Sequence, residues 1–192
     1  MSDTVRLIFQ AILLALAVFH IFKHQYKEMK AALIALLLSF LPMLLDKWVH
    51  VNVDIVSTFL YFMIIFLSIY LGSSLRFYDR YKWWDRTIHF LSGAAFVGFG
   101  IAIVDNSIGV STWLALLFSF TFSVTLHVFW EVLEYISDCI THGNAQRWQL
   151  INAAINHVSV KAIQPAGLVD TMNDFICCIS GSVLAVIIWW IV

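Results

Sequence analysis

Six long apolar stretches dominate the sequence and limit the folds it can adopt. They cover residues 5–22, 31–45, 53–72, 87–104, 112–136 and 175–192. A helix needs about 20 apolar residues to cross the hydrocarbon core of a bilayer. The stretches are continuously apolar rather than alternating, which excludes the strands of a membrane β-barrel. We therefore predict an all-α polytopic membrane helix bundle of about six transmembrane helices, built as a single transmembrane domain over residues 1–192.

The composition agrees with a membrane protein and excludes two other classes. Apolar residues make up 61% and charged residues 12% of the 192 residues, against usual shares of about 45–50% and 25%. With 11 basic and 12 acidic residues, the net charge of −1 offers no excess of basic charge for nucleic acid. The only cysteines are Cys139, Cys177 and Cys178, an odd number that excludes a secreted domain built on disulfides.

The expected ends of the spans follow from helix-breaking residues and from the spacing of apolar residues. Pro42 and Asp46 are expected to close the second span. In the long connection 137–174, apolar residues recur at helical spacing: Trp148, Ile151, Ile155, Val158 and Ala162. This pattern predicts a short amphipathic interfacial helix before the last span, ended by Pro165 and Gly167. No basic segment precedes the first span and no small-residue cleavage site follows it, so we do not expect a cleavable signal.

Lysine and arginine predict the orientation in the membrane. The odd-numbered connections carry nine of the 11 basic residues: Lys23, Lys27, Lys30, Arg76, Arg80, Lys82, Arg86, Arg147 and Lys161. Only Arg6 and Lys47 lie on the other side. Positively charged loops stay in the cytoplasm. The odd connections are therefore expected to be cytoplasmic and both termini outside.

Polar residues inside the apolar stretches follow a helical pattern. The fifth span carries His127, Glu131, Glu134 and Asp138 at offsets of four, three and four, which place them on one helix face. A carboxylate near the bilayer centre costs about 2.5–3.5 kcal/mol on insertion scales. Acidic residues in such positions therefore usually mark a functional site.

Two other spans add polar pairs at the same level of the bundle. The fourth span begins with Asp85 and His89, and the sixth is preceded and opened by Asp170 and Asp174, each pair four residues apart. Because the fourth and sixth spans begin on the side where the fifth ends, the three polar stripes are expected to meet. So many carboxylates cannot all stay ionised in a low dielectric, so they must share protons or bind cations.

Two sources of cations are visible. One is a divalent metal such as Zn, Mg, Mn or Fe, with six candidate ligands: His89, His127, Glu131, Glu134, Asp170 and Asp174. Four carboxylates are candidate catalytic residues: Glu131, Glu134, Asp138 and Asp85. The other source is a basic set that would form ion pairs: Arg76, Arg80, Lys82 and Arg86. For any one residue, a satisfied buried pair that fixes helix packing is the simpler alternative.

The histidines of the first span and the small residues of the fourth span lead to two further expectations. His20 and His24 end the first span and are expected at the membrane interface. Ser92-Gly93, Gly98 and Gly100 are expected to let neighbouring helices approach the fourth span closely.

The order of these motifs resembles a known family. Phe77-Tyr78, Trp84-Asp85, His89 and Ser92-Gly93 are followed by Trp130-Glu131 with Glu134 and Asp138, and then by Gly167, Asp170-Thr171 and Asp174. Over roughly residues 40–190 the chain resembles the YjdF-like family of multi-pass bacterial inner-membrane proteins. The resemblance implies a multi-pass inner-membrane protein and marks the acidic positions and His89 as part of the family pattern, but it assigns no activity. The likeness to VanZ-like membrane proteins is looser and transfers no residue roles.

The motifs leave three functions open. Zinc-protease H-E-x-x-H, P-loop, G-x-S-x-G and dinucleotide patterns are absent from the sequence. The first hypothesis is a metal-dependent hydrolase or transferase acting on a lipid or lipid-linked substrate, with one free carboxylate as general base. The second is a small proton- or cation-coupled transporter or channel that uses the same carboxylates, whose framework a homodimer would enlarge. The third is a non-catalytic membrane scaffold.

Overall fold

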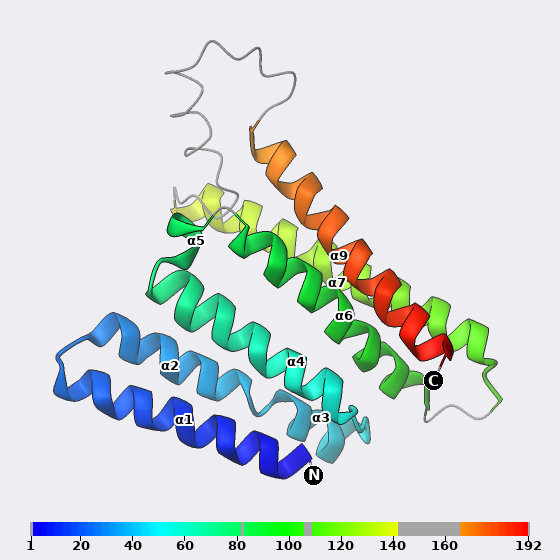
Figure 1. Ribbon diagram of the computed structural model, residues 1–192, viewed down its shortest axis with the longest axis horizontal. Coiled ribbons are helices and arrows are strands. Elements are labelled where there is room, and N and C mark those ends of the chain that lie inside the picture. The colour runs from blue at the N-terminus through cyan, green and yellow to red at the C-terminus, as the bar shows by residue number, and fades with distance from the viewer. Residues whose placement is uncertain (1, 82, 106–108, 142–165, 192) are drawn as a thin grey trace.

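The protein is a bundle of long helices, described for residues 2–81, 83–105, 109–141 and 166–191 in a computed structural model (Figure 1). Its elements are α1 Ser2–Phe22, α2 Tyr26–Leu38, α3 Leu41–Val49, α4 Ile55–Ile65, the π-helix η1 Phe66–Ser74, α5 Phe77–Arg80, α6 Trp84–Asp105, α7 Thr112–Thr141 and α9 Ala166–Ile191. In this described part there is no strand, and six helices are long and apolar enough to cross a membrane. The prediction of an all-α polytopic bundle is confirmed.

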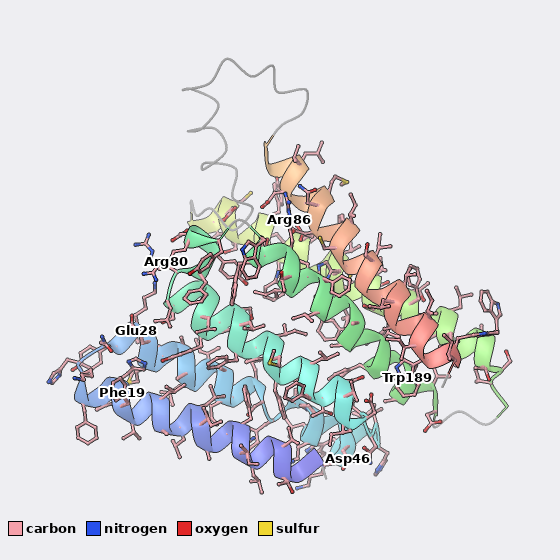
Figure 2. The ribbon with its side chains drawn as sticks, viewed as in Figure 1. Phe19, Glu28, Asp46, Arg80, Arg86 and Trp189 are labelled. Carbon is pink, nitrogen blue, oxygen red and sulfur yellow. The ribbon has the colours of Figure 1, made fainter. Side chains whose placement is uncertain are left out.

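Helix α6 occupies the centre of the bundle. It contacts α4 on one side and α7 and α9 on the other, while α1 packs on α2 and α2 packs on η1 (Figure 1). Of the residues in the apolar segment of α6, 56% are buried within the protein, against 17% of those in the apolar segment of α1. The side chains drawn in Figure 2 fill the spaces between neighbouring helices. Both chain ends lie at one end of the bundle, as an even number of spans requires.

The second span is longer than predicted. Pro42 does not close it, because this residue lies in the first turn of α3, where its missing N–H is not needed. Ser39 and Phe40 separate α2 from α3, and together the two helices span Tyr26–Val49. His50 ends α3 in the left-handed region at φ 58°. The prediction that Pro42 and Asp46 end this span is therefore wrong.

The third span changes its winding partway. Asp54 caps α4 by accepting hydrogen bonds from the backbone N–H groups of Val56 and Ser57 at 2.8 and 3.0 Å. The span then continues as the π-helix η1. A carbonyl oxygen of η1, that of Leu67, accepts a hydrogen bond of 3.2 Å from the Trp84 indole N–H at the start of α6. This hydrogen bond joins the π-helix to α6, the helix that carries His89.

A buried histidine joins α1 to η1. The ring nitrogens of His20 lie 2.8 Å from Gln25 Oε1 and 2.6 Å from the Tyr70 hydroxyl, and His20 is only 5% exposed. His20 thus lies near the end of α1 with its ring turned into the bundle, where these two partners satisfy both ring nitrogens. His24 is exposed, as expected.

The last helix begins earlier than predicted. Helix α9 starts at Ala166 rather than at residue 175, so Gly167 is helical and does not form the expected turn. Asp170 and Asp174 consequently both lie within the helix, one turn apart on one face. The predicted interfacial helix over residues 148–162 and Pro165 lie outside the described residues.

Helices α6 and α9 touch through two glycines. A side chain on Gly93 would collide with the carbonyl group of Cys178, and one on Gly181 would collide with the carbonyl group of Phe90. Backbone therefore contacts backbone in both directions, a packing that only residues without a side chain permit. The expected close packing at Ser92-Gly93 is confirmed. The other two predicted packing glycines face α4 and α7: Gly98 and Gly100.

This packing predicts a sharp difference between two neighbouring positions on α9. Gly181→Val should lower the free energy of unfolding by about 1–3 kcal/mol, because the new side chain has to push α6 away. Ser180→Val, at an exposed position one residue away, should leave it nearly unchanged. Steric trapping or unfolding in mixed micelles measures the difference. Equal stability of the two variants would contradict the backbone contact.

Candidate metal centre

Two buried serines hold together the three helices that form the site. The hydroxyl groups of Ser123 on α7 and Ser182 on α9 both donate to the carbonyl oxygen of Gly93 on α6, at 2.9 and 3.2 Å. The two hydroxyl oxygens lie 3.0 Å apart, and both serines are fully buried. This serine clamp satisfies a backbone carbonyl deep in the bundle and sets the register of α6, α7 and α9.

The functional side chains lie one or two helical turns from the serine clamp. His89 precedes Gly93 by four residues, and His127 follows Ser123 by four. Asp174 precedes Cys178, and Cys178 precedes Ser182, at the same interval. Residues four apart share a helix face, so the contacts that align the clamp also align a second layer. This layer is termed the His–acid cluster and consists of Asp85, His89, His127, Glu131 and Asp174.

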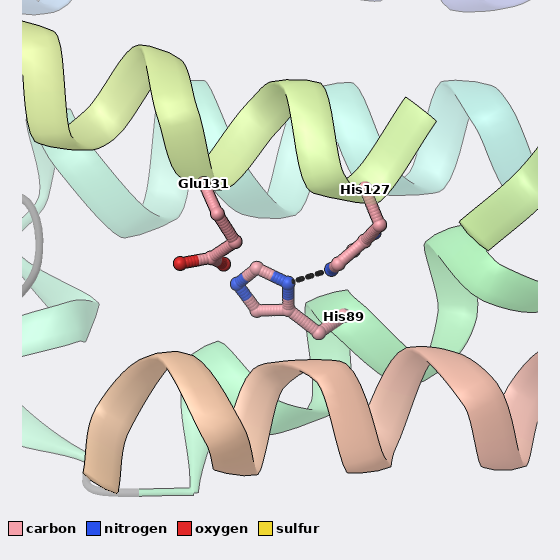
Figure 3. Close-up of side chains that lie close together, drawn as sticks. All are labelled: His89, His127 and Glu131. Atoms are coloured by element: carbon pink, nitrogen blue, oxygen red, sulfur yellow. Dashed lines mark hydrogen bonds between the residues drawn. The ribbon is translucent and has the colours of Figure 1, made fainter. Parts of the chain in front are cut away.

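His89 lies at the centre of the His–acid cluster. Its Nδ1 atom is hydrogen-bonded with Nε2 of His127 (Figure 3). Its Nε2 atom lies 3.4 Å from Asp85 Oδ1 and 3.9 Å from Asp174 Oδ1. The two imidazole rings meet edge to face, with centroids 4.5 Å apart and planes 75° apart. The two nitrogens of one ring thus face different partners from three helices.

Glu131 adds a carboxylate with an unsatisfied oxygen. The residue is 5% exposed, and its Oε1 atom is buried without a hydrogen-bond partner in the described part of the chain. Figure 3 shows its carboxylate directed toward the His89 ring. A buried carboxylate oxygen without a partner is costly. Such an atom beside two imidazoles is a ready ligand for a cation.

The donor atoms are close enough to share an ion. One atom each from His89, His127 and Glu131 lie within 4.8 Å of one another, and the same holds for Asp85, His89 and Asp174. Metal–ligand bonds of about 2.0–2.1 Å in a tetrahedral site place the ligand atoms about 3.3 Å apart. Imidazole and carboxylate together suit Zn, Fe or Mn.

The basic residues proposed as an alternative cation source are exposed where the structure describes them. Arg76 pairs with Asp79 at 2.9 Å, and these side chains are 70% and 50% exposed. Arg80 and Arg86 are exposed, and Lys82 lies outside the described residues. Within the His–acid cluster, the carboxylates of Asp85 and Asp174 lie 3.4 and 3.9 Å from His89 Nε2.

The structure separates the predicted site residues into two sets. Glu134 lies outside both ligand groups, and its carboxylate accepts a hydrogen bond of 2.6 Å from the Trp130 indole. Asp138 and Asp170 are half-buried and also belong to neither group. These three residues lie farther along α7 and α9 toward the same end of the bundle. They form a rim beyond the His–acid cluster.

Sequence analysis did not identify the residues that support the centre. Ser123 and Ser182 passed unnoticed because serine is common in membrane helices and their pairing joins residues 59 positions apart. Gly181 was not predicted either, because its contact with Phe90 joins residues far apart in the sequence. The one usable signal was the run of small residues Cys178, Gly181 and Ser182, whose spacing places them on one face of an apolar helix.

Comparison with known proteins identifies a family but no activity. A family model described as "Predicted membrane protein (DUF2238)" matches residues 5–192 and so includes the whole His–acid cluster. Neither a curated protein nor a solved structure matches the sequence.

The unsatisfied carboxylate predicts an unusual effect on stability. Glu131→Met should leave the free energy of unfolding unchanged in the presence of a chelator, or raise it by up to about 2 kcal/mol, because it removes a buried charge without opening a cavity. Asp54→Ala is the contrast, since loss of the α4 cap should cost about 1 kcal/mol. Unfolding in detergent measures both variants. A loss of several kcal/mol in Glu131→Met would show that this carboxylate serves the fold.

Proposed function

The chain belongs to the DUF2238 family of membrane proteins, and we propose that it is a metal-dependent hydrolase or transferase acting on a lipid or lipid-linked substrate. The resemblance to the YjdF-like family agrees with this membership, since that family is of the DUF2238 type. The observation that carries the proposal is the buried convergence of His89, His127 and Glu131 from α6 and α7.

The proposed ligands match a catalytic pattern. Two imidazoles and one carboxylate are a ligand set of catalytic zinc sites, which keep a further coordination position open for water or substrate. A structural site would instead be closed by four protein ligands. An ion held here would polarise the substrate and activate a water molecule.

The two aspartates support this arrangement from the other side of the His89 ring. Asp174, whose side chain is 4% exposed, has its carboxylate 3.9 Å from His89 Nε2 and would help to orient the ring by its negative charge. The Asp85 side chain is more open, at 13% exposed, and lies one residue from the start of α6. We assign it as the general base, because it can reach both the ion and the solvent end of the bundle.

The depth of the cluster favours a lipid substrate. His89 lies five residues after Trp84, and Asp174 lies eight residues after Ala166. These intervals correspond to about 8 and 12 Å of helix, just beneath a headgroup layer of about 5–8 Å. At this level α7 exposes large apolar side chains such as Phe129 and Leu133, which are 62% and 58% exposed. Membrane lipid would therefore contact the helix that carries His127 and Glu131.

We further propose that the cluster faces the cytoplasm in a bacterial inner membrane. The connections at this end of the bundle carry nine of the 11 basic residues, and positively charged loops remain in the cytoplasm. The rim residues Glu134, Asp138 and Asp170 would then meet a substrate approaching from the inner leaflet.

Metal binding and headgroup release test the enzymatic proposal. The chain reconstituted in phospholipid vesicles should bind Zn²⁺ and release a water-soluble headgroup only when metal-loaded. His89→Asn should weaken binding by more than about 100-fold, because loss of a ligand costs more than loss of its supporting partner. Asp85→Asn should retain the metal and lose product formation. His24→Asn, at an exposed position at the same end of the bundle, is the matched control.

Other outcomes of these measurements point elsewhere. Proton or cation flux through metal-free vesicles that Glu131→Gln abolishes would establish the transporter instead. Unchanged cell function after Gln and Asn replacement of the whole His–acid cluster would indicate a scaffold.

The proposed orientation is tested with a native cysteine. Cys139 is exposed near the cluster end of α7, whereas Cys178 is buried and Cys177 is half-buried. A membrane-impermeant maleimide should label Cys139 in inverted membrane vesicles and leave it unlabelled in intact spheroplasts. Cys139→Ser controls for labelling at the other two thiols. The reverse pattern would place the cluster outside.

A further inference from the structure

We propose that a cavity between α1, α3 and α4 binds a phospholipid headgroup that carries both a phosphate and an ammonium group. The cavity has a volume of about 140 Å³. It lies at the end of the bundle opposite the His–acid cluster, where Figure 2 labels Asp46, one of the residues that line it. The proposed metal-dependent function uses none of its residues, so this inference is independent of that proposal.

The inner wall of the cavity belongs to the packed core. It includes Phe62 and Val53, which are 2% and 5% exposed. The ring of Phe62 stacks on that of Phe9 on α1, with centroids 4.8 Å apart. This packing fixes the wall, so a ligand would enter a preformed site. The volume is close to the roughly 150 Å³ of a protein cavity that accepts benzene, which is comparable in size with a small headgroup.

Two opposite charges line the cavity without pairing with each other. Arg6 comes from α1 and Asp46 from α3, yet no ion pair joins the two side chains. Lys47 does not line the cavity, and its ammonium lies over the Trp48 ring at 5.8 Å from the centroid. Arg6 would attract a simple anion that Asp46 repels, and a simple cation would meet the reverse. A ligand that carries both charges can satisfy both side chains.

The chemistry of the polar lining suits phosphate and ammonium. A guanidinium is a planar fork of N–H donors that can bind two phosphate oxygens at once. Arg6 already makes another contact, which its five N–H groups allow it to keep. The exposed carboxylate of Asp46 can accept hydrogen bonds from an ammonium. Asn52 and Thr58 add an amide and a hydroxyl group to the lining.

The depth of the cavity favours a membrane lipid as the source of the headgroup. Arg6 lies four residues after the start of α1, and Asp46 lies three residues before the end of α3. These intervals correspond to about 6 and 5 Å of helix, the level of a headgroup layer of about 5–8 Å. Leu7 and Ile8 follow Arg6 and are 59% and 56% exposed. Acyl chains would therefore contact the helix that carries Arg6.

Phosphoethanolamine matches the two charges better than other common headgroups. Its ammonium carries three N–H donors for Asp46, whereas the trimethylammonium of phosphocholine carries none. A phosphoglycerol headgroup has a phosphate for Arg6 but no cation for Asp46. The cavity should therefore select phosphatidylethanolamine over phosphatidylglycerol.

Lipid binding to the full chain tests this selection. Chelator-treated protein in detergent is mixed with equal amounts of phosphatidylethanolamine and phosphatidylglycerol, and bound lipid is measured by native mass spectrometry. Wild type should hold one phosphatidylethanolamine per chain, with a preference of at least about 10-fold over phosphatidylglycerol.

Two charge-removing variants and one control locate the binding to the cavity. Arg6→Gln should weaken phosphatidylethanolamine binding by at least about 10-fold, because the phosphate loses its guanidinium. Asp46→Asn should abolish the preference between the two lipids, since Arg6 then supplies the only charge. Lys47→Gln is the matched control, because it removes a charge next to Asp46 but outside the cavity lining, and it should leave the preference unchanged.

Thermal unfolding in detergent gives a second measurement and checks that each variant folds. A ligand that binds only the folded state raises Tm, so phosphatidylethanolamine should raise the Tm of wild type more than phosphatidylglycerol does. Asp46→Asn should lose this difference. If Arg6→Gln does not fold, Arg6→Lys takes its place, and its weaker lipid binding would show the need for the guanidinium fork.

Several results would overturn the inference. Equal affinity of wild type for the two lipids would contradict a site for paired charges. Unchanged lipid binding in both charge-removing variants, or an equal change in Lys47→Gln, would place the binding elsewhere. Displacement of the lipid by an equal concentration of soluble glycerophosphoethanolamine would overturn the membrane as the source of the headgroup. Because the protein is metal-free in every measurement, none of these results bears on the proposed metal-dependent function.

Discussion

The contact between the backbones of α6 and α9 underlies the rest of the structure. Gly93 and Gly181 let the two helices approach until each meets a carbonyl group of the other. Inside a bilayer, such packing and interhelical hydrogen bonds replace the hydrophobic effect as the force that joins helices. The hydroxyls of Ser123 and Ser182, which converge on the Gly93 carbonyl, bring α7 into the same unit. The relative rotation of all three helices is therefore set near the middle of the bundle.

The rotation of these three helices also sets the positions of the side chains that lie one turn away from the contacts. Polar side chains four residues from the contacts are carried to the same faces, so His89, His127 and Asp174 meet rather than pointing into lipid. The resulting cluster is costly without a cation, because three carboxylates lie close together in a low dielectric. An apolar interface would stabilise the bundle at lower cost. The retained polar groups, and the unsatisfied oxygen of Glu131 above all, are the observations on which the proposed cation site depends.

Local sequence patterns predicted some boundaries well and others poorly. The start of α7 at Thr112 coincides with the predicted one, because a clear change in polarity marks it. The second span and α9 were predicted too short, since Pro42 and Gly167 were taken as breakers. Proline is tolerated in the first turn of a helix, and a glycine within α9 is held helical by its neighbours. A proline or glycine therefore indicates the end of a helix only where the neighbouring residues do not themselves support helical structure.

By itself, the sequence determined the class of the protein, the number of spans and the end of the bundle at which polar residues gather, because hydropathy, helical spacing and the odd–even order of spans need no knowledge of packing. The tertiary structure alone decided which polar residues meet. Asp85, His89, His127, Glu131 and Asp174 form the two ligand groups, whereas Glu134, Asp138 and Asp170 do not belong to them. The difference depends on helix rotation, which is set by contacts between residues far apart in the sequence, such as Gly93 with Cys178 and Ser123 with Ser182.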